Sequence, residues 1–267
     1  MKQYFVIFFF LITAVMANAQ QKDSVSVGLP MTGNRPNVMH SYGGVVTDGF
    51  NYWEDRFRGH WSGIYFGVND FSREDYSNYP EEDAGFLDVN LLRSTVMDLN
   101  LIQFSRGLQR TRNTIGLVSG IGLGLQTYFL DKNTSLEKSI YKVEPIKLFY
   151  DSNQKSKLSS VYLNVPLLAE FQVPVKNYGN RFYVAAGVVT GIRLSTHTKI
   201  KYRVNAKKEK RKMPDDYYLH DVRFSATLRM GYRWVNLFAT YDIKPLFKES
   251  YGPELYPFSV GIALFSF

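Results

Sequence analysis

The 267-residue sequence contains no cysteine, so it has no disulfide framework and no cysteine to carry an N-terminal lipid. Charged residues are also scarce, at 21% of the chain, whereas soluble domains average ~25%. Yet the mean hydropathy of −0.21 is too polar for a protein that crosses a membrane with helices. These shortages exclude a lipoprotein, a disulfide-built domain and a helical membrane protein.

Aromatic residues, in contrast, are abundant, at 16% of the chain with 19 Tyr and 20 Phe. Many aromatics at a middling hydropathy are typical of a membrane β-barrel, because its strands alternate between lipid-facing apolar and interior polar side chains. The composition therefore favours an all-β membrane protein.

The N-terminus has the three parts of an export signal. Lys2 gives a positive start, Tyr4 to Val15 form an apolar run, and Ala17-Asn18-Ala19 is a small-x-small cleavage site. The run is shorter than the ~20 residues of a membrane-spanning helix, which disfavours a retained anchor. We predict a signal peptide over residues 1–19, a periplasmic segment over 20–57 that packs under a barrel or stays mobile, and the barrel over 58–267.

Eight segments alternate apolar and polar residues or are rich in β-branched and aromatic ones, which predicts strands. They cover about 61–71, 95–104, 115–126, 161–173, 182–195, 222–233, 234–243 and 256–267. Several span ten residues or more, as a tilted strand that crosses a bilayer must, whereas globular strands average ~5–6 residues.

The connections alternate in length. Those over 72–92, 131–157 and 199–220 are long, 244–255 is moderately long, and those over 105–112, 174–180 and near Arg233 are short. Outer-membrane barrels have long extracellular loops and short periplasmic turns. We therefore predict an eight-stranded antiparallel transmembrane β-barrel of up-and-down topology in the outer membrane, with both termini periplasmic; the alternative is a soluble periplasmic β-sandwich.

Three stretches resemble one family, the PorT-like outer-membrane β-barrel proteins of Bacteroidota. They are Phe57–Asn69, similar to the first-strand region, Gly231–Tyr241, similar to the penultimate hairpin, and Tyr251–Gly261, similar to the final loop and strand. The resemblance covers residues 57–267 and implies a fold and a location but no catalytic residues. Phe265 and Phe267 look like the terminal signal that the barrel assembly machinery reads in outer-membrane barrels.

If the apolar faces meet lipid, four charged residues point into the barrel, with Asp98 and Asp242 as companions. They are Glu170, Arg193, Arg223 and Arg229. An eight-stranded barrel is filled by its own side chains, and buried charges must pair. We expect Glu170 to pair with one of these arginines as an internal plug, and the glycines of 115–126 to make room for arginine side chains or to permit curvature. The alternative is a narrow anion-selective pore.

One segment holds most of the formal net charge of +8. Its basic residues are Lys199, Lys201, Arg203, Lys207, Lys208, Lys210, Arg211 and Lys212. We predict an extracellular loop that attracts lipopolysaccharide phosphates, with a solvated, mobile charge run as the alternative. Nucleic acid is not expected, because Tyr202 is the one interleaved aromatic.

No motif predicts catalysis, a cofactor or a metal. The histidines His40, His60, His197 and His220 lack metal-site spacing, and a neighbouring pair such as His220-Asp221 is expected by chance. We predict a structural or partner-docking protein of the outer membrane that binds an unknown protein through its loops. A small pore or a transport or secretion-system component is the alternative.

Overall fold

A computed structural model describes residues 57–266 apart from 110–113, 148–154, 176 and 205–206. The predicted signal peptide, nearly all of the segment 20–57, and Phe267 lie outside the described residues. Eight long strands build the fold: β1 (Gly63–Asp75), β2 (Thr95–Gly107), β3 (Ile115–Phe129), β6 (Lys155–Val175), β7 (Asn177–Val204), β9 (Val222–Tyr232), β10 (Val235–Asp242) and β11 (Glu254–Ser266).

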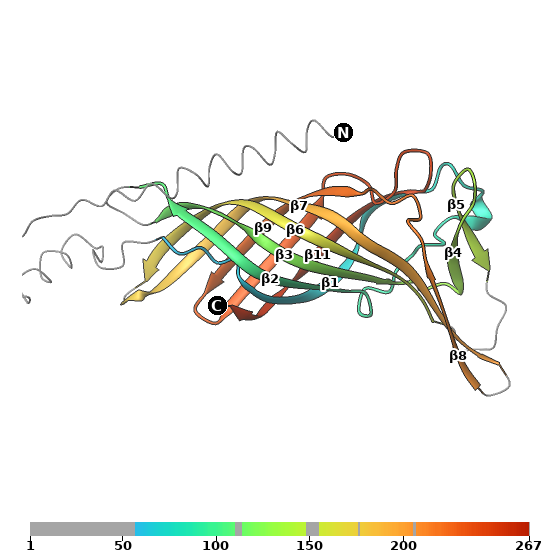
Figure 1. Ribbon diagram of the computed structural model, residues 1–267, viewed down its shortest axis with the longest axis horizontal. Coiled ribbons are helices and arrows are strands. Elements are labelled where there is room, and N and C mark those ends of the chain that lie inside the picture. The colour runs from blue at the N-terminus through green and yellow to red at the C-terminus, as the bar shows by residue number, and fades with distance from the viewer. Residues whose placement is uncertain (1–56, 110–113, 148–154, 176, 205–206, 267) are drawn as a thin grey trace, which may run out of the picture. The chain divides into compact units, whose positions relative to one another are not determined.

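These eight strands form a closed ring (Figure 1). Each pairs antiparallel with the next one along the chain, β6 with β7 among them, and β11 pairs with β1 to close it. Closure leaves no free sheet edge, which is what a strand structure needs in lipid. The predicted eight-stranded up-and-down barrel is confirmed, and the β-sandwich alternative is wrong.

The barrel wall shows the alternation that the sequence predicted. On β9, Phe224 and Leu228 are 37% and 41% exposed on the outside, while Ser225 and Arg229 are 0% and 2% exposed on the inside. The other long strands present further large apolar side chains outward, such as Leu167. So much exposed apolar surface is stable against hydrocarbon and unfavourable in water.

Three short strands and a turn of 3-10 helix were not predicted. They are β4 (Thr134–Lys138), β5 (Val143–Lys147), β8 (Lys207–Pro214) and η1 (Glu81–Asp83). β4 and β5 pair as a hairpin inside the expected loop 131–157. β8 pairs with the end of β7, so the segment predicted as a basic loop has the local structure of a β-hairpin.

The sequence did carry a signal for this hairpin. Basic residues alternate with Ile200, Tyr202 and Val204, which is the period-2 pattern of a strand. The density of positive charge, typical of a solvated loop, concealed it. Among the described residues, no helix is long and apolar enough to span a membrane.

Candidate functional site

A short strap over residues 57–62 enters the barrel at the end with the short turns. Phe57 and Trp61 are 4% and 1% exposed and pack with buried side chains of β3, β6 and β7. The carboxamide of Gln103 on β2 holds the strap. Its oxygen accepts from the backbone N–H groups of Trp61 (2.6 Å) and Ser62 (2.9 Å), and its nitrogen donates to Gly59 O (2.8 Å). The strap thus fills this end of the interior.

The buried carboxylate of Glu170 binds the same strap. The His60 backbone N–H donates to Oε2 (2.9 Å), His60 Nδ1 lies 2.6 Å from Oε1, and Gln172 Nε2 donates to Oε1 (2.6 Å). Glu170 therefore meets His60, and the expected pairing with Arg193, Arg223 or Arg229 was wrong. The strap occupies the space beside Glu170 in which an arginine side chain was expected. The His60 ring also stacks on Tyr183, with centroids 4.0 Å apart.

Arg229 does point into the barrel, as predicted, but aromatic rings surround it. Its guanidinium carbon lies 4.0 Å from the centroid of a Trp61 ring and 4.4 Å from that of Tyr65. Cations on aromatic faces are stabilised by the negative charge of the π face, more so when water is excluded. Arg229 thus connects the wall of the barrel to the strap.

Two glycines of β3 make room for the strap. A side chain at Gly116 would collide with the Phe57 ring, and a Cβ at Gly120 would lie 2.7 Å from Trp61. The expectation that the glycines of this strand accommodate arginines was wrong, and the alternative that they permit curvature stays a prediction. Among the described residues, a glycine that does meet an arginine is Gly191 on β7, where a Cβ would lie 2.6 Å from Arg223 Nε.

A polar layer crosses the middle of the barrel around Arg223. Arg223 Nη1 lies 3.8 Å from Asp242 Oδ2, and Arg223 Nη2 donates to Asn164 Oδ1 (3.4 Å). Asn164 Nδ2 in turn donates to Asp98 Oδ1 (3.4 Å), and Ser225 Oγ donates to Asp242 Oδ1 (2.5 Å). The two companion acids predicted from the sequence do lie in this layer, beside Arg223.

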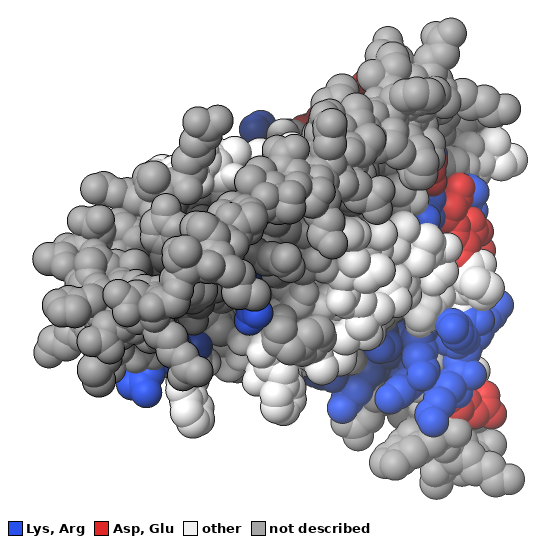
Figure 2. Space-filling model, turned by 60° about the vertical axis from the view of Figure 1, so that its left-hand side comes forward, with Lys and Arg blue, Asp and Glu red and all other residues white. Residues whose placement is uncertain are grey.

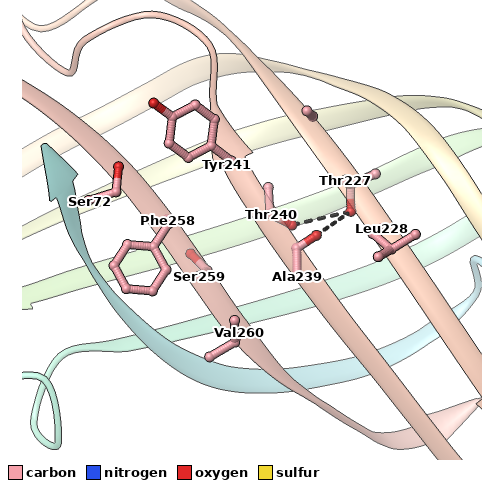
Figure 3. A pocket seen from close by; sticks show the side chains of 10 residues that line it. Ser72, Thr227, Leu228, Ala239, Thr240, Tyr241, Phe258, Ser259 and Val260 are labelled. Atoms are coloured by element: carbon pink, nitrogen blue, oxygen red, sulfur yellow. Dashed lines mark hydrogen bonds between the residues drawn. The ribbon is translucent and has the colours of Figure 1, made fainter.

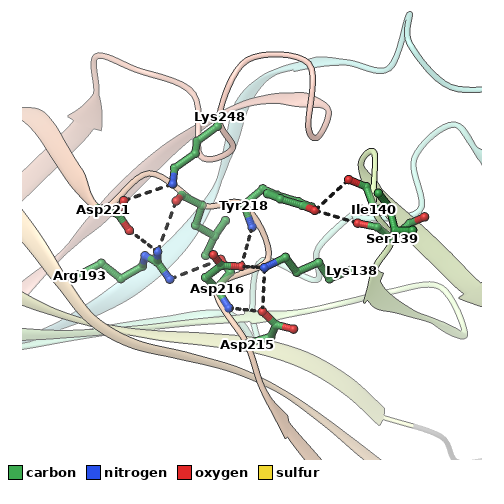
Figure 4. Close-up of polar contacts among 10 residues, drawn as sticks. Lys138, Ser139, Ile140, Arg193, Asp215, Asp216, Tyr218, Asp221 and Lys248 are labelled. Atoms are coloured by element: carbon green, nitrogen blue, oxygen red, sulfur yellow. Dashed lines mark hydrogen bonds and ion pairs between the residues drawn. The ribbon is translucent and has the colours of Figure 1, made fainter.

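Arg193 lies at the opposite rim and braces a loop (Figure 4). It pairs with Asp221 and donates to the backbone oxygens of Asp216 (3.3 Å) and Leu219 (3.4 Å). The pairing of β6 with β7 shifts register beside Arg193. Arg193 precedes this shift and pairs with Tyr162, which is 2% exposed, so its side chain lies on the inward face at the rim. The shift changes the face of the residues that follow it, from Ser195 onwards.

At this rim, the long connections fold into a cap with its own apolar core. Buried side chains of the cap and of the strand ends form one cluster: Phe71, Tyr79, Phe86, Leu87, Tyr128, Leu130, Leu136, Val143, Leu158, Tyr217, Leu219, Leu246, Phe247 and Leu255. Tyr79 donates to Val143 O (2.7 Å), and burial raises the pKa of Tyr79 to about 12. The cap thus closes the second end of the barrel.

Polar contacts fix the β4–β5 hairpin to the rest of the cap (Figure 4). Lys138 Nζ lies 2.5 Å from Asp216 Oδ1 and 3.3 Å from Asp215 Oδ1. The hydrogen bond to Asp216 raises the pKa of Lys138, and the same bond lowers the pKa of Asp216. Tyr218 donates to Ser139 O (2.9 Å).

The predicted basic residues lie together on the hairpin of β7 and β8, and Figure 2 shows Lys and Arg side chains gathered on one face. The side chains of Arg203, Lys207 and Lys208 lie outside the described residues. At the C-terminus, Phe265 pairs with Ile64 of β1 and is 67% exposed.

One hollow lies on the outer wall, between β9, β10 and β11 (Figure 3). It has a volume of about 510 Å³, and Ala226 and Ala239 leave space beside larger apolar residues such as Phe258. Thr227 Oγ1 donates to Ala239 O (3.2 Å) within the wall. The largely apolar lining of the hollow suits the acyl chain of a lipid. Throughout the described part of the chain, no three His, Asp or Glu side chains gather as metal ligands.

A closed ring with an apolar outer face defines an integral β-barrel membrane protein. Residues 102–251, more than half of the chain, match the family described as outer membrane protein beta-barrel domain. The chain belongs to this family and is an outer-membrane protein. No curated protein and no solved structure matches it. The narrower resemblance to PorT-like proteins stays a prediction.

Proposed function

We propose that this barrel has a structural, partner-docking role in the outer membrane and neither conducts solutes nor catalyses a reaction. The observation that carries the proposal is the closure of the interior at both ends. The strap fills one end through Phe57 and Trp61, and the cap covers the other with its own apolar core.

Opening a path through the strap end would be costly. A solute would have to displace the buried Trp61 ring and break the hydrogen bonds that Gln103 and Glu170 make to the strap. Each bond contributes only about 1 kcal/mol, but a buried group left without a partner costs more. Nothing in this arrangement favours the pore alternative.

The cap is the surface that we propose for docking. Ile140 and Tyr141, at the tip of the β4–β5 hairpin, are 83% and 81% exposed. The tip is ordered, because Ser139 N donates to Lys142 O (3.0 Å) and Tyr218 holds the Ser139 carbonyl. Apolar side chains on an ordered protrusion suit insertion into a partner protein, where aromatic residues contribute much of the binding energy.

Single-channel recording in planar bilayers tests the closed interior. The refolded full-length protein should give no steady conductance, whereas a Trp61→Ala/Gln103→Ala variant, whose strap is weakened, should show openings. Steady current through the wild-type protein would refute the closed barrel.

Site-specific photo-crosslinking in native membranes tests docking. A crosslinking residue at Tyr141 should give a discrete adduct with a membrane or surface protein, and Ile140→Asp should abolish it. The same residue at Glu137, exposed on β4 of the same hairpin, serves as the control. No adduct at Tyr141, or equal adducts at both positions, would contradict a docking tip.

A further inference from the structure

The barrel wall continues beyond the apolar zone as a three-stranded extension of β6, β7 and β8. Residues paired across neighbouring strands point to the same face. The register pairs Lys157 with Lys199 and Lys199 with Lys212. In the next row it pairs Lys155 with Lys201 and Lys201 with Lys210. One face of the extension therefore carries six lysines, here called the lysine face: Lys155, Lys157, Lys199, Lys201, Lys210 and Lys212.

The opposite face of the extension is fixed to the cap. Leu158 and Ile200 are 1% and 4% exposed, and Leu158 belongs to the apolar core of the cap. The buried Thr198 hydroxyl lies 2.7 Å from the Tyr217 hydroxyl. The lysine face is thus held in one orientation, away from the cap, and is no mobile charge run.

The lysines repel one another. Like charges directly opposite on neighbouring strands are destabilising, and within the described residues none of the six forms an ion pair with a carboxylate. Lys157 Nζ lies over the Phe129 ring (5.3 Å), which it shares with Arg93 (5.1 Å). A fixed face of this kind is stabilised when anions from outside the chain bind to it.

The lysine face lies just beyond the lipid-facing zone. On β6 the outward side chains change from Leu163 and Val161 to Lys157, which is four residues past Val161, roughly 13 Å along a strand. On β7 they change from the exposed Leu194 to Lys199. Phe129 lies at this boundary, where aromatic residues of membrane proteins gather. Lysines at this height reach the headgroups of the surrounding lipid, because their stems extend along apolar surface.

We propose that the lysine face binds the phosphate groups of the glycolipid in the outer leaflet. The long connections that form the cap are typical of the extracellular side, which places this face in that leaflet. Each lysine near an anionic membrane surface contributes attraction, and several in one plane add up. The site goes beyond the proposed docking role, since the lysine face is a surface separate from the hairpin tip.

Binding of fluorescent diphosphoryl lipid A to the full-length protein in dodecylmaltoside micelles tests this proposal. We expect the same lipid without its phosphates to bind far more weakly. The row variant Lys157→Gln/Lys199→Gln/Lys212→Gln should weaken the affinity by roughly tenfold to a hundredfold. Replacing the same three residues by Arg should retain the affinity.

A matched variant separates this site from net charge. Lys132, Lys147 and Lys248 each pair with a carboxylate of the described chain, so their replacement by Gln removes the same charge elsewhere and should leave binding unchanged. Heat-modifiable gel migration checks that each variant is folded. If the row variant does not fold, the single variants Lys199→Gln and Lys212→Gln should each weaken binding several-fold. Equal binding of both lipids, or an equal loss in row and matched variants, would overturn the proposal.

Discussion

His60 Nδ1 and Glu170 Oε1 lie 2.6 Å apart inside the barrel and join two parts of the chain that are 110 residues apart in sequence. Glu170 belongs to the wall, whereas His60 belongs to the strap that precedes β1. This contact, together with the hydrogen bonds of Gln103, ties the strap to the barrel.

Breaking the contact from the strap side should destabilise the protein. His60→Ala leaves the Glu170 carboxylate, which is 1% exposed, without its contact to the His60 ring, and a buried polar group that loses a hydrogen-bond partner costs about 1–3 kcal/mol. Because the His60 side chain is itself about a third exposed, we expect the lower end of that range. Urea unfolding in lipid vesicles, followed by tryptophan fluorescence, measures the change.

The double variant His60→Ala/Glu170→Gln controls for the buried charge that has lost one partner. It should regain part of the lost stability, because a neutral amide is less costly than a carboxylate to bury with one partner missing. Equal stability of wild type and His60→Ala would show that the pair contributes nothing.

Filling the space beside the strap should release it. A valine at Gly116 would overlap the Phe57 ring, so Gly116→Val should displace Phe57 while the ring of strands stays intact. The strap contains Arg58, whose carbonyl accepts from Gln172 Nε2 (2.6 Å), and trypsin needs this backbone in an extended, free form. We expect cleavage after Arg58 to become at least about tenfold faster. A tenfold rise requires the bound state of the strap to be destabilised by only ~1.4 kcal/mol relative to its released state.

The control for this variant is Ile121→Val, on the outward face of the same strand. It should be cleaved after Arg58 at the wild-type rate. A Gly116→Val protein as resistant as wild type would mean that the strap does not occupy the space that the glycine leaves.

The cap should lose stability in mild acid through His220. Burial, followed by Lys244 and Lys248, lowers the pKa of His220 from its ordinary 6.5. The unfolded cap therefore takes up the proton first, and the stability that this group contributes is present above pH 6.5 and lost as the pH falls below it. The protection of the cap amides, which is the intrinsic exchange rate at each pH divided by the observed rate, should decrease from there downwards.

His220→Gln tests the assignment, because it removes the titrating group. The loss of protection below pH 6.5 should be smaller in this variant than in wild type. The same loss of protection in both proteins would assign the effect to other groups. The acid Asp216, whose pKa Lys138 lowers, responds only further down, as the pH falls below 3.8.

Strand alternation explains why the barrel was predictable and the strap was not. Along β9, every second residue is apolar. A wall with lipid on one side requires this alternation along the whole length of each strand that crosses the membrane. Phe57 and Trp61 are four residues apart in a segment without regular structure, so no periodicity marks them as buried. His60 as the partner of Glu170 follows from tertiary packing alone.

The same limit applies to the charges of the interior. The sequence predicted that Arg223 and Arg229 face inward, and both do. Which acid or ring meets each arginine depends on strand tilt and on the register shift between β6 and β7, and neither is written in a local pattern. The lysine face was hidden for a related reason, because its rows appear only when β6, β7 and β8 are paired.

Cysteine scanning along β9 tests the central claim, a closed barrel with lipid outside and a filled interior. The chain has no cysteine of its own, so single cysteines at successive positions from Val222 to Tyr232 report cleanly. In vesicles, each variant is treated with a lipid-soluble or a water-soluble maleimide. The outward set at 222, 224, 226, 228 and 230 should react with the lipid-soluble maleimide only, and the inward positions between them should react with neither. Reaction of the outward set with a water-soluble maleimide, or of the inward set at an equal rate, would contradict the account.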